Sequence, residues 1–579
     1  MIKRIGFLLM MITLLQACGG GEATNEEQAG LTPGKGGVYF GGTLKLNEVE
    51  YFKTLYPLNI TEVTGHRTIT QIYEGLVGFV QKDLSIEPVL AESWDISEDG
   101  KTYTFHIRKG VTFHDDPCFP GGKGRAITAN DFKYCFDRAC YYNPANNQGY
   151  TFAIDVIKGA QEYFDATKEG NVDPNGVSGV SVIDDYTLQI ELIKPFSAFL
   201  SRLALPWSNL YPKEAVEKYG AEMRTHTVGT GPFTIKALKE DQVIFLEKNK
   251  NYWGKDEFGN QLPYLDLVKI SFINDNKKQL EQFEKGELDM VYRIPLEAKD
   301  NIVDIDDNLL GKYQQYQLQA RPVLAIQYYG FLNVDPVFKS KEVRQAFCYA
   351  IDREKICDFT LKGTGFPANY GIIPPGTGSY DATRVNGYKF NPEKAQELMA
   401  KAGYKNGEGF PSLTLQINSG GKRNESVAEA VEKMLEENLN IDIEIARMPF
   451  AQHTEAVESA KFQFWRLGWV ADYPDPENFL TLFDLNWYQP DLSIKSYKNS
   501  FRYKSEEFDQ YFKAALATTD EEERNILYAK ADQVVIDDAV CLPIFYDKDY
   551  RLVQPDVKNF YQNAMEYRNA KDVYFVPEN

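Results

Sequence analysis

The stretch FWRLGWVADYPDPENFL, Phe464 to Leu480, is the centre of the predicted fold and carries the candidate binding residues. It begins as an apolar strand, crosses an acidic turn with two prolines and continues into a helix. The segments leading to it alternate as strand, helix, strand, helix and strand, over 413–417, 427–435, 441–445, 451–461 and 462–469. This order predicts parallel βαβ units with right-handed crossovers. Open α/β sheets bind ligands beyond the carboxyl ends of their strands, which is where residues 470–475 fall.

The two aspartates of the turn are predicted to differ in role. Asp475-Pro476-Glu477 is a typical helix opening, with Asp475 as the N-cap and Pro476 at the first helical position. Asp472 has no such role, so its carboxylate could pair with an ammonium group or could be a solvated turn carboxylate. Tyr473 could line a pocket or pack on the turn.

Arg466 and Trp469 are the companions of Asp472 on the preceding strand. A guanidinium in an apolar strand needs a partner. Arg466 could receive a carboxylate bidentately, or it could form a structural salt bridge. Trp469 could form a pocket wall or could be a core residue. Together with Asp472, this stretch could hold both ends of a zwitterion.

Composition excludes several classes of function. A chain of 579 residues is too long for one hydrophobic core. Its net charge of −20 argues against nucleic-acid binding. The sequence has five histidines, no CxxC or His/Cys cluster with metal spacing, and no motif for a catalytic nucleophile or zinc protease. We therefore expect no enzyme activity, no cofactor and no metal, while 36 Tyr and 36 Phe suit binding by stacking.

The N-terminus is predicted to be an export signal. Residues 5–15 are a mainly apolar run behind a basic start, too short to span a bilayer. Leu15-Gln16-Ala17-Cys18 resembles a lipobox, which makes Cys18 the candidate lipidation site after removal of residues 1–17. The alternative is an ordinary signal peptide with a chance cysteine. Residues 18–37 are predicted to be a flexible tether.

Six cysteines remain after Cys18, an even number that would permit disulfides in an exported protein. Two of them have a simpler interpretation. Thr128-x-x-Asp131 predicts a helix start, and Cys135 and Cys140 then lie on its apolar stripe. We expect both to be buried core residues.

Several segments resemble the extracytoplasmic solute-binding proteins of oligopeptide and dipeptide ABC transporters (bacterial solute-binding protein family 5). They are IEPVLAESWDISEDGKTYTFHIRKGVTFHD, ITANDFKYCFDRA, GTGPFTI, LNVDPVFKSKEVRQAFCYAIDREKI and GWVADYPDPENFL. The resemblance covers nearly all of the chain after residue 40. One departure is the turn of residues 115–122, which is longer than is usual in the family.

The resemblance implies an α/β, periplasmic binding protein-like fold, with two main α/β lobes joined by a hinge and a third, α+β lobe. The implied division is 38–83, 206–310 and 541–579 for lobe I, 84–205 for the extra lobe II, and 311–540 for lobe III. A ligand would be enclosed by closure of the two main lobes.

The resemblance also implies roles for individual residues. Asp472 matches the aspartate that holds the α-ammonium of a peptide, and Arg466 matches an arginine that meets the carboxylate of some peptides. Trp469 matches the tryptophan between them. In the tail, an aromatic residue at Phe545 or Tyr546 would contact the ligand, and Tyr546 is the candidate that we carry forward.

The expected function is that of a monomeric, lipid-anchored receptor, periplasmic or at the cell surface. It would capture short peptides and deliver them to an ABC transporter permease. The alternatives are a receptor for a non-peptide solute, such as an oligosaccharide or metal complex, and an exported hydrolase or adhesin on the same fold.

Overall fold

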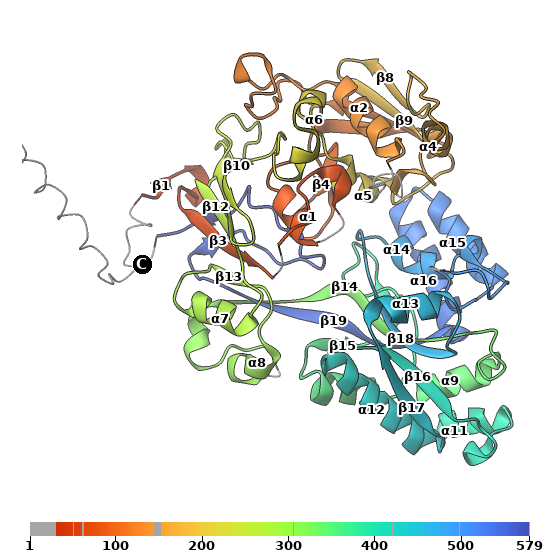
Figure 1. Cartoon of the computed structure of the whole chain (residues 1–579). Coiled ribbons are helices and arrows are strands. Elements are labelled where there is room, and N and C mark those ends of the chain that lie inside the picture. The colour runs from red at the N-terminus through yellow and green to blue at the C-terminus, as the bar shows by residue number, and fades with distance from the viewer. Residues whose placement is uncertain are drawn as a thin grey trace, which may run out of the picture.

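Two long antiparallel strands, β14 (Gln317–Phe331) and β19 (Cys541–Val553), run through the middle of the molecule and connect its two halves (Figure 1). The computed structural model describes residues 30–49, 51–60, 63–143, 152–304, 306–419, 422–496 and 498–577. Cys18 and the predicted signal peptide lie outside these residues. The structure confirms the predicted fold class, an α/β binding-protein fold with more than one lobe.

Each long strand contributes to two separate cores. From Leu324 onward β14 packs with the core formed mainly by residues 324–546, and so does β19 as far as Tyr546. Beyond these points the strands pack with the cores of the other half. We call these the C-terminal half and the N-terminal half. The chain therefore passes between the halves inside both strands, and on β19 this passage lies between Tyr546 and Tyr550.

The C-terminal half contains the predicted parallel βαβ units. Strands β16 and β17 are parallel, as are β16 and β18, whereas β14 pairs with β18 in the antiparallel direction. The sheet order is β13-β19-β14-β18-β16-β17, with β15 beside β19. The bounds are Met290–Val291 (β13), Gly365–Pro367 (β15), Leu413–Asn418 (β16), Ile443–Met448 (β17) and Phe464–Val470 (β18).

The N-terminal half holds two four-stranded sheets. One has the order β10-β11-β12-β3, formed by Phe233–Lys239, Val243–Lys248, Leu267–Phe272 and Thr43–Glu48. The other has the order β6-β7-β9-β8, formed by Ala91–Ile96, Thr102–Ile107, Thr187–Glu191 and Val180–Asp184. Tight turns at Asp99-Gly100 and Asp184-Asp185 connect the antiparallel pairs β6–β7 and β8–β9, and Gly100 adopts the positive φ of 68° that such turns favour. Short pairs are β4 (Val77–Phe79) with β5 (Ile86–Pro88) and β20 (Val557–Lys558) with β21 (Tyr574–Phe575).

The helices cover the faces of these sheets (Figure 1). Those of the N-terminal half are α1 (Val63–Ile69), α2 (Ala129–Cys140), α4 (Ala160–Lys168), α5 (Phe199–Leu203), α6 (Lys213–Tyr219), α7 (Asn276–Glu284) and α8 (Leu296–Ile302). Those of the C-terminal half are α9 (Lys341–Tyr349), α10 (Arg353–Lys355), α11 (Pro392–Lys401), α12 (Lys422–Leu439), α13 (Phe450–Glu458), α14 (Glu477–Leu480), α15 (Glu506–Ala517) and α16 (Glu521–Asp537).

The predicted tether is wrong for residues 30–37, which belong to the folded body. Strand β1 (Thr32–Pro33) pairs with β2 (Tyr39–Phe40). The backbone N–H of Lys35 donates to Asn260 Oδ1 at 3.0 Å, and the Asn260 side chain donates back to the Lys35 carbonyl at 2.9 Å. These long-range partners were not apparent from the glycine-rich composition.

The six cysteines after Cys18 are all free thiols. Cys135 and Cys140 are buried on the inner face of α2, as the capped apolar stripe predicted. Thr128 and Asp131 form the predicted capping box of this helix.

Candidate functional site

The acidic turn follows β18 directly and is built by Asp475. The Asp475 carboxylate is buried and accepts the backbone N–H of Glu477 at 2.9 Å. Its carbonyl accepts the N–H of Asn478 at 3.1 Å. Asp475 therefore has the structural role that the sequence predicted, although the regular helix begins at Glu477, one residue later than expected.

Asp472 is the exposed carboxylate of the turn. Neighbouring protein partly desolvates the Asp472 side chain, which raises the pKa of Asp472 above the ordinary aspartate value. Interactions with Asn478, Lys498 and Arg202 oppose this rise. Asp475 and Glu477, in contrast, are both buried. Of these three acids, Asp472 is thus the one that a ligand can reach.

Asn478 fixes the backbone of the turn and was missed in the sequence. Its Oδ1 accepts the backbone N–H of Asp472 at 3.1 Å and the indole N–H of Trp469 at 3.0 Å. Asn478 is buried, so this shared acceptor holds both groups in a fixed geometry. Trp469 is partly buried and packs against the C-terminal core.

Arg466 is held by neutral groups. Its guanidinium donates to Asn418 Oδ1 at 3.1 Å and to Gln327 Oε1. Burial lowers the pKa of Arg466, and the nearby Arg423 lowers it further. The alternative of a structural salt bridge is not the arrangement found among the described residues, because these two hydrogen bonds of the guanidinium go to amide oxygens. A partly exposed cation held in this way can receive an anion.

Gln327 and Asp547 form the support behind Arg466. Gln327 Nε2 donates to Asp547 Oδ2 at 2.7 Å, and Arg423 Nη1 lies 2.7 Å from Asp547 Oδ1. Gly468 makes room for this amide, because a Cβ at that position would lie 2.4 Å from Gln327 Oε1. Isolated sequence patterns could not find these partners, because Gln327 lies on β14 and Asp547 on β19.

Two predicted ligand contacts, Tyr473 and Tyr546, are buried in this structure. Tyr473 is 2% exposed, and its hydroxyl donates to Glu477 Oε2 and accepts from Arg202 Nε at 3.3 Å. Tyr546 is fully buried, and its hydroxyl donates to the carbonyl of Gly371 at 2.7 Å. Neither side chain has a surface available to a ligand in this structure. The alternative residue Phe545 is also buried.

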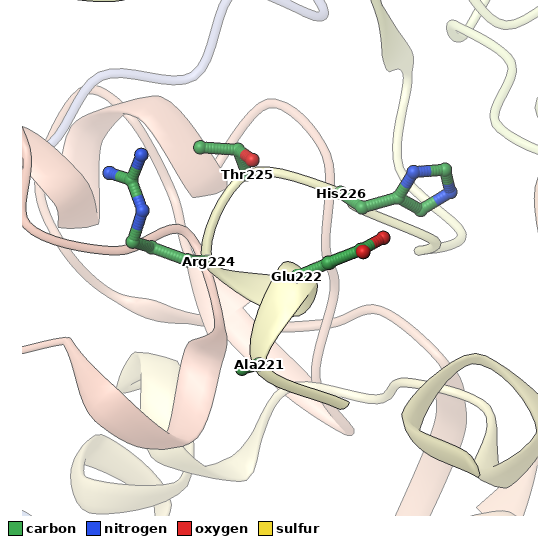
Figure 2. A pocket seen from close by; sticks show the side chains of 5 residues that line it. All are labelled: Ala221, Glu222, Arg224, Thr225 and His226. Atoms are coloured by element: carbon green, nitrogen blue, oxygen red, sulfur yellow. The ribbon is translucent and has the colours of Figure 1, made fainter. Parts of the chain in front are cut away.

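A separate shallow pocket lies in the N-terminal half, lined by Ala221, Glu222, Arg224, Thr225 and His226 (Figure 2). One short stretch of chain forms it. His226 Nε2 lies 2.8 Å from Asp116 Oδ2, within the turn of residues 115–122. This pocket is not the site around Asp472.

Within the described ranges, no group of three or more His, Cys, Asp or Glu side chains is arranged to hold a metal ion. No helix among those that the structure describes is long and apolar enough to cross a bilayer.

Sheet topology and the turn after β18 define a solute-binding fold, and comparison with known proteins identifies the family. The model of the bacterial extracellular solute-binding proteins, family 5 (middle), matches residues 85–490. The chain belongs to this family, as the sequence resemblance predicted.

Its relatives bind different solutes according to their names. The dipeptide-binding protein DppE of Bacillus subtilis is 30% identical, covering 89% of this chain and 88% of that protein. Heme-binding protein A of Haemophilus influenzae is also 30% identical, covering 88% of each chain. Among solved structures, DppA of Helicobacter pylori in complex with the peptide STSA has a TM-score of 0.70 and 25% identity, covering 93% of this chain and 98% of that one. HbpA2 of Haemophilus parasuis has a TM-score of 0.78 at 23% identity, covering 93% and 100%.

Proposed function

We propose that this protein is a lipid-anchored receptor that binds short peptides and delivers them to an ABC transporter permease, without chemistry of its own. The observation that carries the proposal is the pairing of opposite charges on one strand and its turn. Asp472 offers an exposed carboxylate, and Arg466 offers a cation whose hydrogen bonds among the described residues go to amide oxygens. A peptide has an ammonium group and a carboxylate that would complement them.

The relatives support this ligand class. DppE is named as a dipeptide-binding protein, and DppA of Helicobacter pylori was solved with a peptide. The oligopeptide-binding protein OppA of Escherichia coli is 28% identical, covering 92% of each chain. In our proposal Asp472 receives the α-ammonium group, Trp469 contributes to the wall beside it, and Arg466 receives a carboxylate.

The direct test is native mass spectrometry of the purified full chain, followed by calorimetry with the peptides identified. We expect bound masses that correspond to short peptides, and binding that falls sharply when the peptide amino group is acetylated. Equal affinity for free and acetylated peptides would contradict the role of Asp472, because acetylation removes the charge that it recognises.

A second candidate ligand is a non-peptide solute such as a haem. The name of Heme-binding protein A, at 30% identity, favours this alternative. A ligand without an ammonium group would leave Asp472 unpaired, which is costly for a carboxylate that loses hydration. Titration with haemin in parallel with peptides separates the two, and an absorbance change in the Soret region without peptide binding would favour haem.

The anchoring part of the proposal rests on Cys18 and the preceding apolar run. Replacement of Cys18 by serine in the producing cell should move the protein from the membrane fraction to the soluble fraction. It should also remove the lipid mass from the N-terminal peptide. A protein that stays in the soluble fraction with Cys18 intact would refute lipidation.

A further inference from the structure

Tyr473 connects the acidic turn to the opposite half of the molecule. Among the buried residues that the structure describes between 324 and 546, it alone belongs to the core formed by residues 44–290 and 553–575. Asp472 is its neighbour in the chain. The position of the Asp472 carboxylate therefore depends on the packing of Tyr473 against the core of the N-terminal half.

Arg202 is the residue of the N-terminal half that forms a hydrogen bond with Tyr473. It lies on α5 and is 5% exposed. Its Nε donates to the Tyr473 hydroxyl at 3.3 Å, and its guanidinium carbon lies 5.6 Å from the centre of that ring. The other side of the guanidinium is fixed within the N-terminal half, where Nη1 donates to Asp155 Oδ1 at 3.0 Å and to the Phe152 carbonyl at 3.3 Å. Arg202 thus offers the turn a hydrogen-bond donor whose orientation is already fixed by the N-terminal half.

Arg202 also provides the positive charge that faces the acids of the turn. Burial raises the pKa values of Asp475 and Glu477, and the charge of Arg202 opposes the rise at both. It acts in the same direction on Asp472. The Tyr473 hydroxyl, bonded to both Glu477 and Arg202, links the two halves in one buried polar network.

A second contact between the halves lies beside this network. Ser197 Oγ is 3.3 Å from the Tyr528 hydroxyl of α16, and the Ser197 backbone N–H donates to the Leu516 carbonyl of α15 at 3.3 Å. Tyr528 in turn interacts with the carboxylate of Asp475. The segment of residues 196–202 therefore lies against the acidic turn and the helices that support it (Figure 1).

We infer that Arg202 is a positioning residue that couples closure of the two halves to capture of the ligand ammonium group. When the halves are together, Arg202 and Glu477 fix Tyr473, and Tyr473 fixes the orientation of Asp472. When the halves separate, Tyr473 loses its contact with Arg202 and with the N-terminal core, and the turn keeps the contacts made by Asn478 and Glu477. This inference rests on the proposed peptide function and assigns a role to a residue outside the acidic turn.

The test compares Arg202→Gln and Arg202→Lys with the unchanged protein. With a tripeptide that binds the unchanged protein, we expect Arg202→Gln to raise the dissociation rate about tenfold with little change in association rate, as is typical when a bound state is destabilised. Arg202→Lys should restore part of the loss, since it returns the charge without the planar fork. Combining Arg202→Gln with Tyr473→Phe should add less than the sum of the two separate effects, because both act through one contact.

A matched control is Arg125→Gln. Arg125 also holds two carboxylates, with Nη2 2.6 Å from Asp131 Oδ1 and Nε 2.7 Å from Glu214 Oε1, but both partners lie in the N-terminal half. We expect it to lower the melting temperature without changing the dissociation rate of the peptide. An equal change in dissociation rate for Arg125→Gln and Arg202→Gln would overturn the inference, because general destabilisation would then explain both.

A ligand-free measurement keeps this inference separate from the proposed function. Spin labels at Glu162 on α4 and Glu507 on α15, both exposed, would report the distance between the halves in a Cys118→Ser background. We expect Arg202→Gln to shift the distance distribution toward longer values. Unchanged distributions would overturn the inference even if peptides bind, whereas a shift without any peptide binding would refute only the proposed ligand.

Discussion

The guanidinium of Arg466 is held by the side-chain amide of Gln327, one strand away on β14. The same amide donates to Asp547 at 2.7 Å, so a carboxylate supports the arginine only through a neutral group. This relay orients the guanidinium without neutralising it directly. It leaves the charge of Arg466 available to an anionic group of a ligand.

Replacing Arg466 by glutamine should weaken binding of those peptides whose carboxylate reaches it. We expect a loss that depends on peptide length and that disappears for the same peptides with an amidated C-terminus. Calorimetry with a series of two to five residues would measure this. Arg447→Gln is the matched control, because Arg447 is partly exposed at the end of β17 and pairs with Glu425 and Glu429 at 3.9 and 3.6 Å. Equal losses at every length would count against a carboxylate contact.

Gly468→Ala should change the orientation of the Arg466 guanidinium without changing its charge. The new Cβ would lie 2.4 Å from Gln327 Oε1 and would displace the amide that orients the guanidinium. We expect weaker binding of the peptides that are sensitive to Arg466→Gln and little further loss in the double variant. Full additivity of the two substitutions would show that they act separately.

Asp472→Asn should remove the charge that receives the ligand ammonium group. The expected loss is roughly 2–5 kcal/mol of binding free energy, the range for breaking a desolvated charge pair. Asp491→Asn is the control, because Asp491 is exposed and its carboxylate accepts hydrogen bonds from Ser493 in its own turn. Unchanged peptide affinity of Asp472→Asn would refute the anchoring role.

Peptide binding should also weaken in acid. The surrounding protein raises the pKa of Asp472, so its carboxylate takes up a proton at a higher pH than an ordinary aspartate. Affinity should therefore fall as the pH falls through this raised value, and the Asp472→Asn variant should lack that phase. Calorimetry of both proteins over a series of pH values gives the comparison. A wild-type profile parallel to that of the variant would show that another group is responsible.

Glu74 should make stability fall as the pH rises toward neutrality. It is buried and accepts hydrogen bonds from Thr230, Tyr252 and Trp253, and burial raises its pKa to about 7. Between the pKa of an unfolded glutamate and 7, the folded state binds more protons than the unfolded state. The free energy of unfolding should thus decrease by up to about 1.4 kcal/mol per pH unit in that window. Glu74→Gln should flatten this part of the profile in urea unfolding, and an identical slope in the variant would contradict the prediction.

Tyr546→Phe should change stability and leave peptide affinity unchanged. The hydroxyl of Tyr546 satisfies the buried carbonyl of Gly371, and its loss should cost about 1–3 kcal/mol of unfolding free energy. Urea unfolding and calorimetry on the same preparation test both parts. A selective loss of peptide affinity would restore the ligand role that the sequence resemblance suggested.

Local sequence patterns were sufficient for elements whose partners are close in the chain. The capping box of Thr128 and the role of Asp475 each depend on residues within a few positions. The exposure of Asp472 also followed from its place after a parallel strand. These features depend on contacts between residues that are close in the chain, so they can be predicted directly from the sequence.

The remaining features depend on distant partners. Gln327 and Asp547 reach Arg466 through sheet pairing, and Arg202 reaches Tyr473 from the other half. The family resemblance offered Tyr546 as a ligand contact, but its strand β19 is central in its sheet, and Tyr546 is buried there. The hydrophobic periodicity of one segment does not show which residues of another segment it contacts.

The crossing of β14 and β19 has a thermodynamic consequence for the binding cycle. The ladder between these strands is interrupted from Pro322 to Ile326, where the chain passes between the cores, and proline has no N–H to donate. Ordered, hydrogen-bonded strand continues on both sides of this gap. A rotation of the halves at the gap would leave the connecting backbone as ordered as before, whereas freezing a flexible loop costs about 1–2 kcal/mol per residue. The conformational entropy of the connecting strands is thus lost once, during folding. Each cycle of ligand binding then begins without that entropic cost.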